Sequence, residues 1–366
     1  MTQEPEILFT ITGAVGVVTL NRPQALNALT FDMVRQLDQM LITWTKDPAI
    51  KAVILTGAGS RAFCAGGDVK TVAMHGMAAM KKGEGGGAVL RDFFREEYTL
   101  NHRIFTFPKP YISLINGIVM GGGMGISAHG SHRVITENAL FAMPETSIGF
   151  FPDVGGGYFL PRCPGQIGTY LALTSNHIKA FDTMHIGFAT HFVPAVHLAR
   201  LNEEIIRSPH DLDALLKKYS TAPSGESDII PYHKKINRYF SHNHIEDILR
   251  DLEKDSSAWA IETLKTMNAV SPTSLKIALK QIRLGAKMSF SEVMTMEYRL
   301  SQACLARHDF YEGIRAALID KDRKPKWQPL TVDAVSDADI EDCFQSLGSQ
   351  DLVLSQEVLY NTRQRK

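Results

Sequence analysis

Net charge is absent from this chain as a whole. Its 366 residues contain 39 Lys and Arg against 39 Asp and Glu, a formal net charge of +0. Without an excess of basic residues there is no electrostatic case for binding nucleic acid or an anionic membrane surface. Long apolar runs are missing as well, since no stretch approaches the roughly 20 residues that span a bilayer. The composition therefore argues against a nucleic-acid-binding or membrane-spanning protein.

Cysteine is scarce and scattered. The four cysteines, at positions 64, 163, 304 and 343, lie too far apart for the CxxC motifs of metal and redox sites. This usage favours a reduced, intracellular protein. Because the first residues include Glu4 and Glu6 and form neither a secretory signal nor an Arg-rich leader, we expect a cytoplasmic protein. The mitochondrial matrix is the alternative if a transit peptide has been removed.

Motifs of three common enzyme classes are missing or incomplete. The zinc motif HExxH and the serine-hydrolase elbow G-x-S-x-G do not occur. Residues 57–62, GAGSRA, match the loose dinucleotide fingerprint, but FCAGGD follows where that fingerprint needs a helix. The pairs His129/His132 and His242/His244 are typical of surface or packing residues. We therefore expect no metal and no nicotinamide cofactor.

Short β-type runs alternate with helical patterns over the first 200 residues. The β-branched runs Val15–Leu20, Ala52–Thr56 and Tyr111–Ile115 predict strands. Between the first two, apolar residues at helical spacing predict a helix over 31–44, with Thr30 placed to cap it. This β–α–β order predicts an α/β fold with parallel strands and crossover helices.

Two further regions complete the predicted organisation. Residues 74–88, rich in glycine and lysine, predict a mobile loop, either a plain connection or a lid, before a helix around Arg91–Arg103. After about residue 200 the pattern is helical, with Ser271-Pro272 and a Ser289/Glu292 capping box opening two helices. We therefore divide the chain into a catalytic core, 1–200, and a mainly helical region, 201–366.

Two glycine-rich turns are the strongest chemical signal. FCAGGD at 63–68 comes shortly after one predicted parallel strand, and GIVMGGGMG at 117–125 comes directly after another. Parallel strands end at the same edge of a sheet, so the two turns can face one another. The N–H groups of Gly67 and Gly122 would then converge on one carbonyl oxygen, beside the positive end of a helix expected near Gly123. The turns predict an oxyanion hole.

Two acidic residues follow the second turn in apolar surroundings. Glu145 and Asp153 could bring carboxyl groups to the same oxygen, where they would supply proton transfers or a nucleophile. Phe141, Phe150 and Phe151 could form a dry wall that raises the pKa of a carboxyl group. Backbone donors beside buried acids are suited to acyl chemistry.

These motifs carry a family resemblance. FCAGGD (63–68), NGIVMGGGMG (116–125) and PETSIGFFPDVGGGYFLPR (144–162) resemble the enoyl-CoA hydratase (crotonase) superfamily. The last motif, with DFYEGIRAALIDKD (309–322), is most similar to the 3-hydroxyisobutyryl-CoA hydrolase branch, and the similarity covers about residues 8–330. It implies a spiral of strand–strand–helix repeats with two roughly perpendicular sheets and a helical C-terminal region. The residue pattern alone predicts only an open parallel sheet.

The departures from the hydratase pattern are informative. Hydratases carry a glutamate two positions after the GGG, where this chain has Gly125, so only Glu145 matches one of their two glutamates. Asp153 stands where hydratases usually have glycine, a replacement that the hydrolase branch shares. The resemblance therefore favours thioester hydrolysis over addition of water to a double bond.

The resemblance implies hydrolysis of a β-hydroxyacyl-CoA thioester, with 3-hydroxyisobutyryl-CoA, a compound of valine catabolism, as first choice and 3-hydroxypropionyl-CoA as second. Gly67 and Gly122 would bind the thioester oxygen. Glu145 would attack the carbonyl or activate water, and Asp153 would hold the β-hydroxyl and transfer a proton. Glu97 matches a substrate-contacting position of the family, although a solvated helix residue is the alternative.

No cofactor is expected beyond the coenzyme A of the substrate, whose phosphates could meet Lys321 and Arg323. The family often forms trimers, so a homo-oligomer is one expectation, and a helical tail that covers that surface is the other. Two other functions stay open: a hydratase or isomerase of the same superfamily, and a non-catalytic acyl-CoA-binding subunit.

Overall fold

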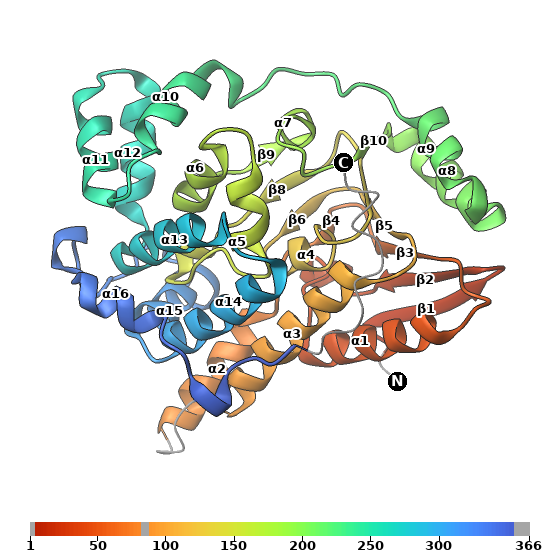
Figure 1. Cartoon of the computed structure of the whole chain (residues 1–366), viewed down its shortest axis with the longest axis horizontal. Coiled ribbons are helices and arrows are strands. Elements are labelled where there is room, and N and C mark those ends of the chain that lie inside the picture. The colour runs from red at the N-terminus through yellow and green to blue at the C-terminus, as the bar shows by residue number, and fades with distance from the viewer. Residues whose placement is uncertain (1–3, 82–87, 355–366) are drawn as a thin grey trace.

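A computed structural model describes residues 4–81 and 88–354, which fold into two β-sheets surrounded by helices (Figure 1). The first sheet has the order β1-β2-β3-β5-β7-β10, and all of its neighbouring strands are parallel except β1 and β2. Its strands are β1 Ile7–Thr12, β2 Val15–Leu20, β3 Ala52–Gly57, β5 Tyr111–Ile115, β7 His132–Ile135 and β10 His191–Phe192.

The second sheet has the order β4-β6-β8-β9, with β9 antiparallel to β8. Its strands are β4 Ala62–Cys64, β6 Ile118–Met120, β8 Leu140–Ala142 and β9 Ile178–Lys179. Along the chain, β3 and β4, then β5 and β6, then β7 and β8 each send one strand to the first sheet and the next to the second. This strand–strand repeat confirms the two-sheet fold, and the single open sheet predicted from the residue pattern is wrong.

Alternation along the strands places a helical layer on each face of the first sheet. Val53 and Leu55 of β3 point into the main core, whereas Ala52 and Ile54 point the other way. On the main-core side α1 (Phe31–Lys46) buries a stripe that includes Trp44, and its N-cap Thr30 accepts a hydrogen bond from the Met33 N–H, as predicted. On the other side lie α8 (Ala195–Arg207) and α9 (Leu212–Tyr219).

The remaining helices of the N-terminal 200 residues are α2 Val69–Lys81, α3 Ala88–Thr106, α4 Gly122–Gly125, α5 Gly156–Phe159, α6 Ile167–Thr174 and α7 Ala180–His185. The later helices are α10 His233–Tyr239, α11 Ile245–Lys254, α12 Ala258–Ala269, α13 Pro272–Gly285, α14 Phe290–Leu305, α15 His308–Ile314 and α16 Asp337–Cys343. Within residues 4–81 and 88–354, none of the helices is long and apolar enough to cross a membrane.

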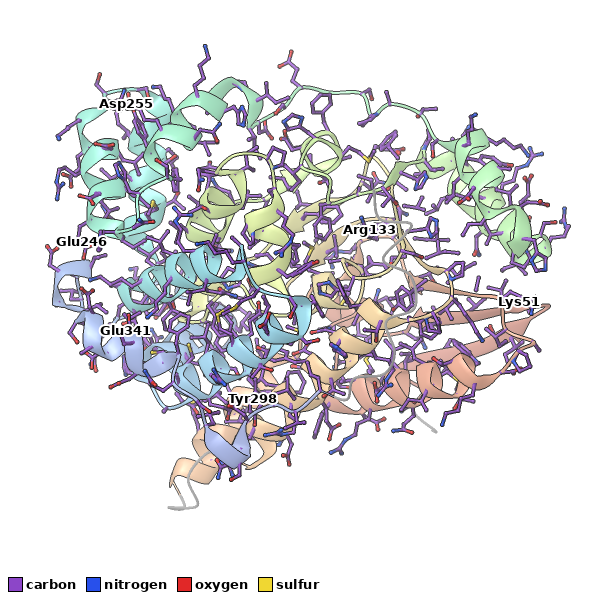
Figure 2. The ribbon with its side chains drawn as sticks, in the orientation of Figure 1. Lys51, Arg133, Glu246, Asp255, Tyr298 and Glu341 are labelled. Carbon is purple, nitrogen blue, oxygen red and sulfur yellow. The ribbon has the colours of Figure 1, made fainter. Side chains whose placement is uncertain are left out.

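The C-terminal helices return to the core rather than forming a separate layer. In Figure 1, α13 lies beside α5, and α14 lies beside α3. Arg95 of α3 donates a hydrogen bond of 2.7 Å to the hydroxyl of Tyr298 on α14; Tyr298 is labelled in Figure 2. One buried cluster contains residues from Ile7 to Leu352. The division into two regions at residue 200 stays a prediction. The buried cluster contains residues from both sides of that position.

Three local predictions can be compared with the structure. Ser271 and the Ser289/Glu292 capping box open α13 and α14 as predicted. The loop predicted over 74–88 is wrong for 74–81, which belong to α2, because Gly76 packs closely against Leu90 of α3 and the Tyr311 ring of α15. The remainder of that prediction, 82–87, lies outside the described residues.

Candidate active site

The two glycine-rich turns meet at one edge of the second sheet. β4 and β6, which precede them directly, pair in parallel with Cys64 opposite Val119, so both turns leave the same edge. The sequence argument had placed them on the wrong strands, those of the first sheet. A side chain at Gly123 would put its Cβ 2.3 Å from the Cys64 carbonyl oxygen, so only glycine allows the turns to approach this closely.

The N–H groups of Gly67 and Gly122 lie side by side. A Cβ built on Gly122 would be 2.9 Å from the Gly67 nitrogen and 2.8 Å from Glu97 Oε1. Neither N–H donates to an acceptor within residues 4–81 and 88–354. The helix expected near Gly123 is the single turn α4, so the positive end that it contributes is smaller than predicted. The turns nevertheless present two neighbouring backbone donors to one point.

Glu145 reaches the same place from the second sheet. It opens the short 3-10 helix η2 (Glu145–Ile148), which follows β8, and its Oε1 would lie 2.7 Å from a Cβ on Gly121. Oε2 of Glu145 and Oε1 of Glu97 are buried with no hydrogen-bond partner among the described residues. Buried polar atoms without partners are rare in native proteins, and here two belong to acids that lie against the second glycine-rich turn.

Asp153 completes the cluster in a strained turn. Val154 and Gly155, the two central residues, have φ of 49° and 88°, and the Gly156 N–H donates 2.7 Å to the Asp153 carbonyl, a pattern typical of a type I′ turn. A β-branched residue with positive φ is a conformational outlier. The Tyr98 hydroxyl donates a hydrogen bond of 2.8 Å to Asp153 Oδ2.

Burial raises the pKa of all three acids, and the charge of Asp153 acts on both glutamates. Burial raises the pKa of Glu145 well above its usual range, and the charge of Asp153 raises it further. The same two causes, in the same order, raise the pKa of Glu97. Burial raises the pKa of Asp153 to about 7, while the hydrogen bond from Tyr98 lowers it. The site therefore holds exchangeable protons near neutral pH, as acid–base chemistry requires.

Comparison with known proteins gives this arrangement a family. The model of the enoyl-CoA hydratase/isomerase family matches residues 15–344. A relative from Xenopus laevis named "3-hydroxyisobutyryl-CoA hydrolase, mitochondrial" is 50% identical over 355 residues, which cover 95% of this chain and 90% of the relative. The chain belongs to the enoyl-CoA hydratase/isomerase family. The human protein of the same name is 48% identical, with 95% and 90% coverage.

Solved structures in the family share the fold over nearly the whole chain. One titled as a carnitinyl-CoA dehydratase from Mycobacterium thermoresistibile is 38% identical, with a TM-score of 0.88 and coverage of 96% of this chain and 99% of its own. Another, titled as an enoyl-CoA hydratase from Rhodobacter sphaeroides 2.4.1, is 36% identical, with a TM-score of 0.84 and coverage of 96% and 100%. Members of the family therefore carry the names of both hydrolases and hydratases.

The surroundings of Gly125 help to distinguish a hydrolase from a hydratase. A Cβ at this position would lie 2.7 Å from both Asn101 Nδ2 and Val154 Cβ. The glutamate that the family resemblance places here in hydratases would collide with both residues. Asn101 is fully buried, and neither polar atom of its side chain has a partner in the described part of the chain. Space that a second hydratase glutamate would need is thus occupied.

Residues outside the predicted list also shape the site. Asn101 lies four residues after Glu97 on α3, so helical spacing from Glu97 would have found it. Tyr98, directly after Glu97, had no such signal. Glu297, a fully buried acid on α14, carried no motif that singled it out in the sequence. His129 is buried against Phe290, as the packing prediction for the histidines requires.

The three phenylalanines predicted to form a dry wall beside the acids have different neighbours. Phe141, Phe150 and Phe151 are all buried, but Phe141 packs on Phe188, while Phe150 stacks on Phe94 of α3 with centroids 5.3 Å apart. No group of three or more His, Cys, Asp or Glu in residues 4–81 and 88–354 is arranged to hold a metal ion.

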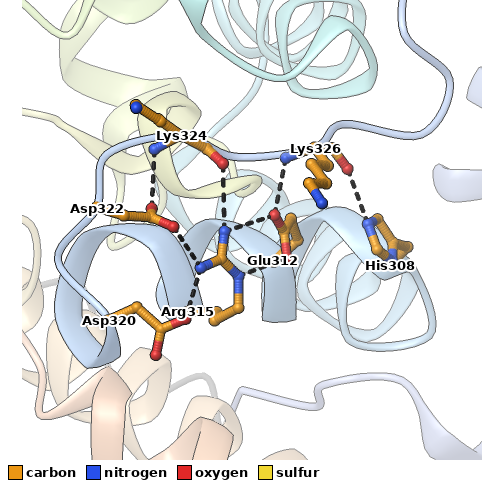
Figure 3. Close-up of polar contacts among 7 residues, drawn as sticks. All are labelled: His308, Glu312, Arg315, Asp320, Asp322, Lys324 and Lys326. Carbon is orange, nitrogen blue, oxygen red and sulfur yellow. Dashed lines mark hydrogen bonds and ion pairs between the residues drawn. The ribbon is translucent and has the colours of Figure 1, made fainter.

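Lys321 and Arg323 lie in the exposed turn after the π-helical segment Arg315–Ile319 that continues α15, both with positive φ. Arg315 closes this turn by binding Glu312, Asp320 and Asp322 (Figure 3). The turn holds the two cations on a fixed backbone at the protein surface. Their contact with coenzyme A stays a prediction.

Proposed function

We propose that this protein hydrolyses a β-hydroxyacyl-CoA thioester, most specifically 3-hydroxyisobutyryl-CoA, to the free hydroxy acid and coenzyme A. The observation that carries the proposal is a cluster of two backbone N–H groups, those of Gly67 and Gly122, with the buried Glu145 and Asp153 carboxyls. Neither N–H group has an acceptor in the described part of the chain. Relatives 48–50% identical over 95% of the chain bear the name of that hydrolase, which supports this substrate over other acyl groups.

The first step places negative charge on the thioester oxygen. The N–H groups of Gly67 and Gly122 donate to that oxygen, and their hydrogen bonds strengthen as it becomes an oxyanion; one such donor is worth ~10²–10³ in rate. Glu145 either attacks the carbonyl carbon or removes a proton from an attacking water. In the first case the C–S bond breaks and leaves an acyl anhydride with Glu145, which water then hydrolyses.

Asp153 supplies proton transfer and recognition. Protonated Asp153 can give its proton to the departing thiolate of coenzyme A, and its carboxylate can accept a proton from the water that completes hydrolysis. A pKa raised to about 7 by burial suits both roles. Its second oxygen would accept a hydrogen bond from the substrate's β-hydroxyl, and Glu97, buried beside Gly122, would contact the acyl group.

The direct test is release of free coenzyme A. Purified protein incubated with 3-hydroxyisobutyryl-CoA and a thiol reagent is expected to produce thiol steadily, and 3-hydroxypropionyl-CoA is the second substrate to compare. Glu145→Gln is expected to abolish turnover while calorimetric titration still detects acyl-CoA binding. Full activity in this variant would remove Glu145 from the mechanism, and absence of turnover alongside binding in the wild type would indicate a binding subunit.

Hydration of an enoyl-CoA is the second candidate, because two similar solved structures carry hydratase or dehydratase titles. The crowding of Gly125 by Asn101 and Val154 disfavours it, since one of the two hydratase glutamates has no space. The loss of absorbance that accompanies hydration of crotonyl-CoA measures this activity. Rapid hydration without thioester hydrolysis would reverse the assignment.

A reducing compartment is the proposed location, either the cytoplasm or the mitochondrial matrix. All four cysteines are free and buried, and the relatives are named mitochondrial. Fractionation of the source cells separates the two compartments. The homo-oligomer expected from the family stays a prediction that light scattering on the purified protein would check.

A further inference from the structure

A fully buried acid lies behind the turn that carries Asp153. Glu297 of α14 accepts hydrogen bonds from the Gly155 N–H at Oε2, 2.7 Å, and from the Gly157 N–H at Oε1, 2.8 Å. Gln281 of α13 donates through Nε2 to Glu297 Oε1 at 2.9 Å and to the Pro152 carbonyl at 2.7 Å. Residues 152–157, the Asp153 loop, are thus bound at both ends by two helices that are distant in sequence.

The Asp153 loop needs such support, because its own sequence does not favour its conformation. Val154 has φ of 49°, a region that β-branched residues rarely adopt and that persists only when the surroundings impose it. The His129 ring donates through Nε2 to the Val154 carbonyl at 2.7 Å. Gly155 cannot carry a side chain, since its Cβ would lie 2.5 Å from the same ring. Each contact holds the backbone next to Asp153.

An ionisable group at this depth is not explained by packing. Neighbouring buried residues on the same helix, Met296 and Leu300, show that an apolar side chain satisfies the core there. A buried carboxyl is costly unless hydrogen bonds compensate it. Burial raises the pKa of Glu297 to about 8, and the N–H groups of Gly155 and Gly157 oppose that shift. Among the described residues, the Glu297 side chain forms hydrogen bonds with the Asp153 loop and with Gln281, which binds the same loop.

We propose that Glu297 is a positioning residue that fixes the Asp153 carboxyl against the substrate's β-hydroxyl, so that it contributes to the choice of hydroxylated over unhydroxylated acyl groups. This inference rests on the proposed thioester hydrolysis. Glu297 itself touches no reacting atom: it acts through the backbone of residues 155–157 and through Gln281. Without it the turn at Val154 relaxes, and the Asp153 carboxyl loses the position in which it can accept a hydrogen bond from the β-hydroxyl.

The main experiment compares two substrates that differ only in the hydroxyl, 3-hydroxyisobutyryl-CoA and isobutyryl-CoA. Glu297→Gln keeps the volume but places an NH2 group against buried N–H donors. We expect kcat/KM for the hydroxylated substrate to fall ~10–100-fold, within the range that a small displacement of a reacting group can cost. For isobutyryl-CoA the expected loss is only a few-fold, so the ratio of the two kcat/KM values collapses.

Two further variants control for general damage to the fold. Ser289→Ala removes the N-cap of the same helix, which destabilises α14 without touching the loop, and is expected to leave the substrate ratio unchanged. Gln281→Met removes only the hydrogen bonds to Pro152 and Glu297 and should lower the ratio partially. An unchanged ratio in Glu297→Gln, or an equal fall in Ser289→Ala, would overturn the proposal.

A double-mutant cycle tests whether the effect passes through Asp153. In an Asp153→Asn background, Glu297→Gln is expected to change the substrate ratio no further, because residues that act through one another are not additive. A full additional loss would mean that Glu297 acts by another route and would contradict the proposal.

Hydrogen exchange gives a readout that does not need turnover. The amides of Gly155 and Gly157 should exchange faster in Glu297→Gln than in wild type. In Ser289→Ala their exchange rates should equal those of wild type. If wild-type protein released no coenzyme A from either substrate, the proposed function would fail, while exchange would still decide whether Glu297 holds the loop. Unchanged exchange in Glu297→Gln would refute the positioning role directly.

Discussion

At the scale of single residues, the site depends on the absence of side chains as much as on the acids. Gly122→Ala would place a methyl group 2.8 Å from Glu97 Oε1 and 2.9 Å from the Gly67 nitrogen, in the space where the acyl oxygen is proposed to bind. We expect the rate of coenzyme A release to fall by ~10²–10³ because the two donors can no longer share one acceptor. Steady-state kinetics measure this loss.

Gly16→Ala provides a matched control for Gly122→Ala. Its Cβ would lie 2.7 Å from the Trp44 ring, a similar collision in β2 rather than in the glycine-rich turns. It should lower the free energy of unfolding by about 1–3 kcal/mol, as overpacking does, and leave kcat unchanged. If Gly122→Ala retained full activity, the proposed oxyanion hole would be wrong.

Asp153 also makes a prediction about stability. Its pKa rises from 3.8 to about 7 on folding, so the folded state holds the proton more tightly than the unfolded state. The stability that this group contributes is complete below pH about 4 and is lost as the pH rises through about 7. Asp153→Asn stays neutral, so its free energy of unfolding relative to wild type should increase by about 3 kcal/mol between pH 5 and pH 8.

Urea unfolding of wild type and Asp153→Asn at the two pH values measures that difference. The charge of Asp153 also raises the pKa of Glu145 and Glu97, so Asp153→Asn removes that effect as well, and its loss changes the difference in the same direction. A difference that stays constant with pH, or becomes smaller as the pH rises, would show that the Asp153 carboxyl is already ionised in the folded protein at pH 5.

At the scale of residues, the sequence predicts those site residues that stand in short contiguous motifs. Gly67, Gly122, Glu145 and Asp153 all stand in short contiguous motifs, and the structure brings all four together. Glu297 could not be predicted, because its partners are N–H groups 140 and 142 residues away. Only the folded chain places them opposite one another.

At the scale of elements, the helix η2 that positions Glu145 rests on α15. A Cβ at Gly313 would lie 2.3 Å from the backbone carbonyl atoms of Ile148, the last residue of η2. Gly313→Ala therefore has to push α15 and η2 apart. We expect the free energy of unfolding to fall by about 1–3 kcal/mol and kcat to fall as well, since a shift near 1 Å can cost ~10² in rate.

Gly187→Ala separates these two effects. Gly187 has φ of 75° with no atom within 4 Å of a built Cβ, so alanine introduces backbone strain but no collision. Thermal unfolding and kinetics of the two variants should show a loss of stability in both and a loss of kcat in Gly313→Ala alone. Equal kcat values would mean that the position of η2 does not control Glu145.

Strands and helices could be predicted from the sequence where the spacing of apolar residues matched a single type of element. The strand Val15–Leu20 has an unbroken β-branched pattern, and the helix that starts after Thr30 has an unbroken apolar stripe and an N-cap. Both are as predicted. The prediction failed at α2, where glycine and lysine suggested a loop, because contacts with α3 and α15 outweigh the local preference. The one-turn length of α4 had no sequence signal, since glycine neither favours nor terminates a helix reliably.

At the scale of the whole molecule, the site lies between the two regions divided at residue 200. The carbonyl of Asp309 contacts Gly149, and α14 binds the Asp153 loop through Glu297. One buried cluster includes residues from both regions. The loops of the proposed catalytic site are therefore held by helices that come later in the chain. Dividing the sequence into two segments could not show these contacts.

This arrangement predicts that the two regions unfold together. Trp44 is buried in the N-terminal region, and Trp327, whose Nε1 donates to the Ala269 carbonyl, reports on the C-terminal region. Two variants, W259F/W327F and W44F/W259F, each retain one of these tryptophans. For each we expect the fluorescence midpoint in urea to coincide with the midpoint from far-ultraviolet circular dichroism, which follows all the helices. Separate midpoints would instead show two domains that fold independently, and the hydrogen bonds across the boundary would then contribute little to their cooperativity.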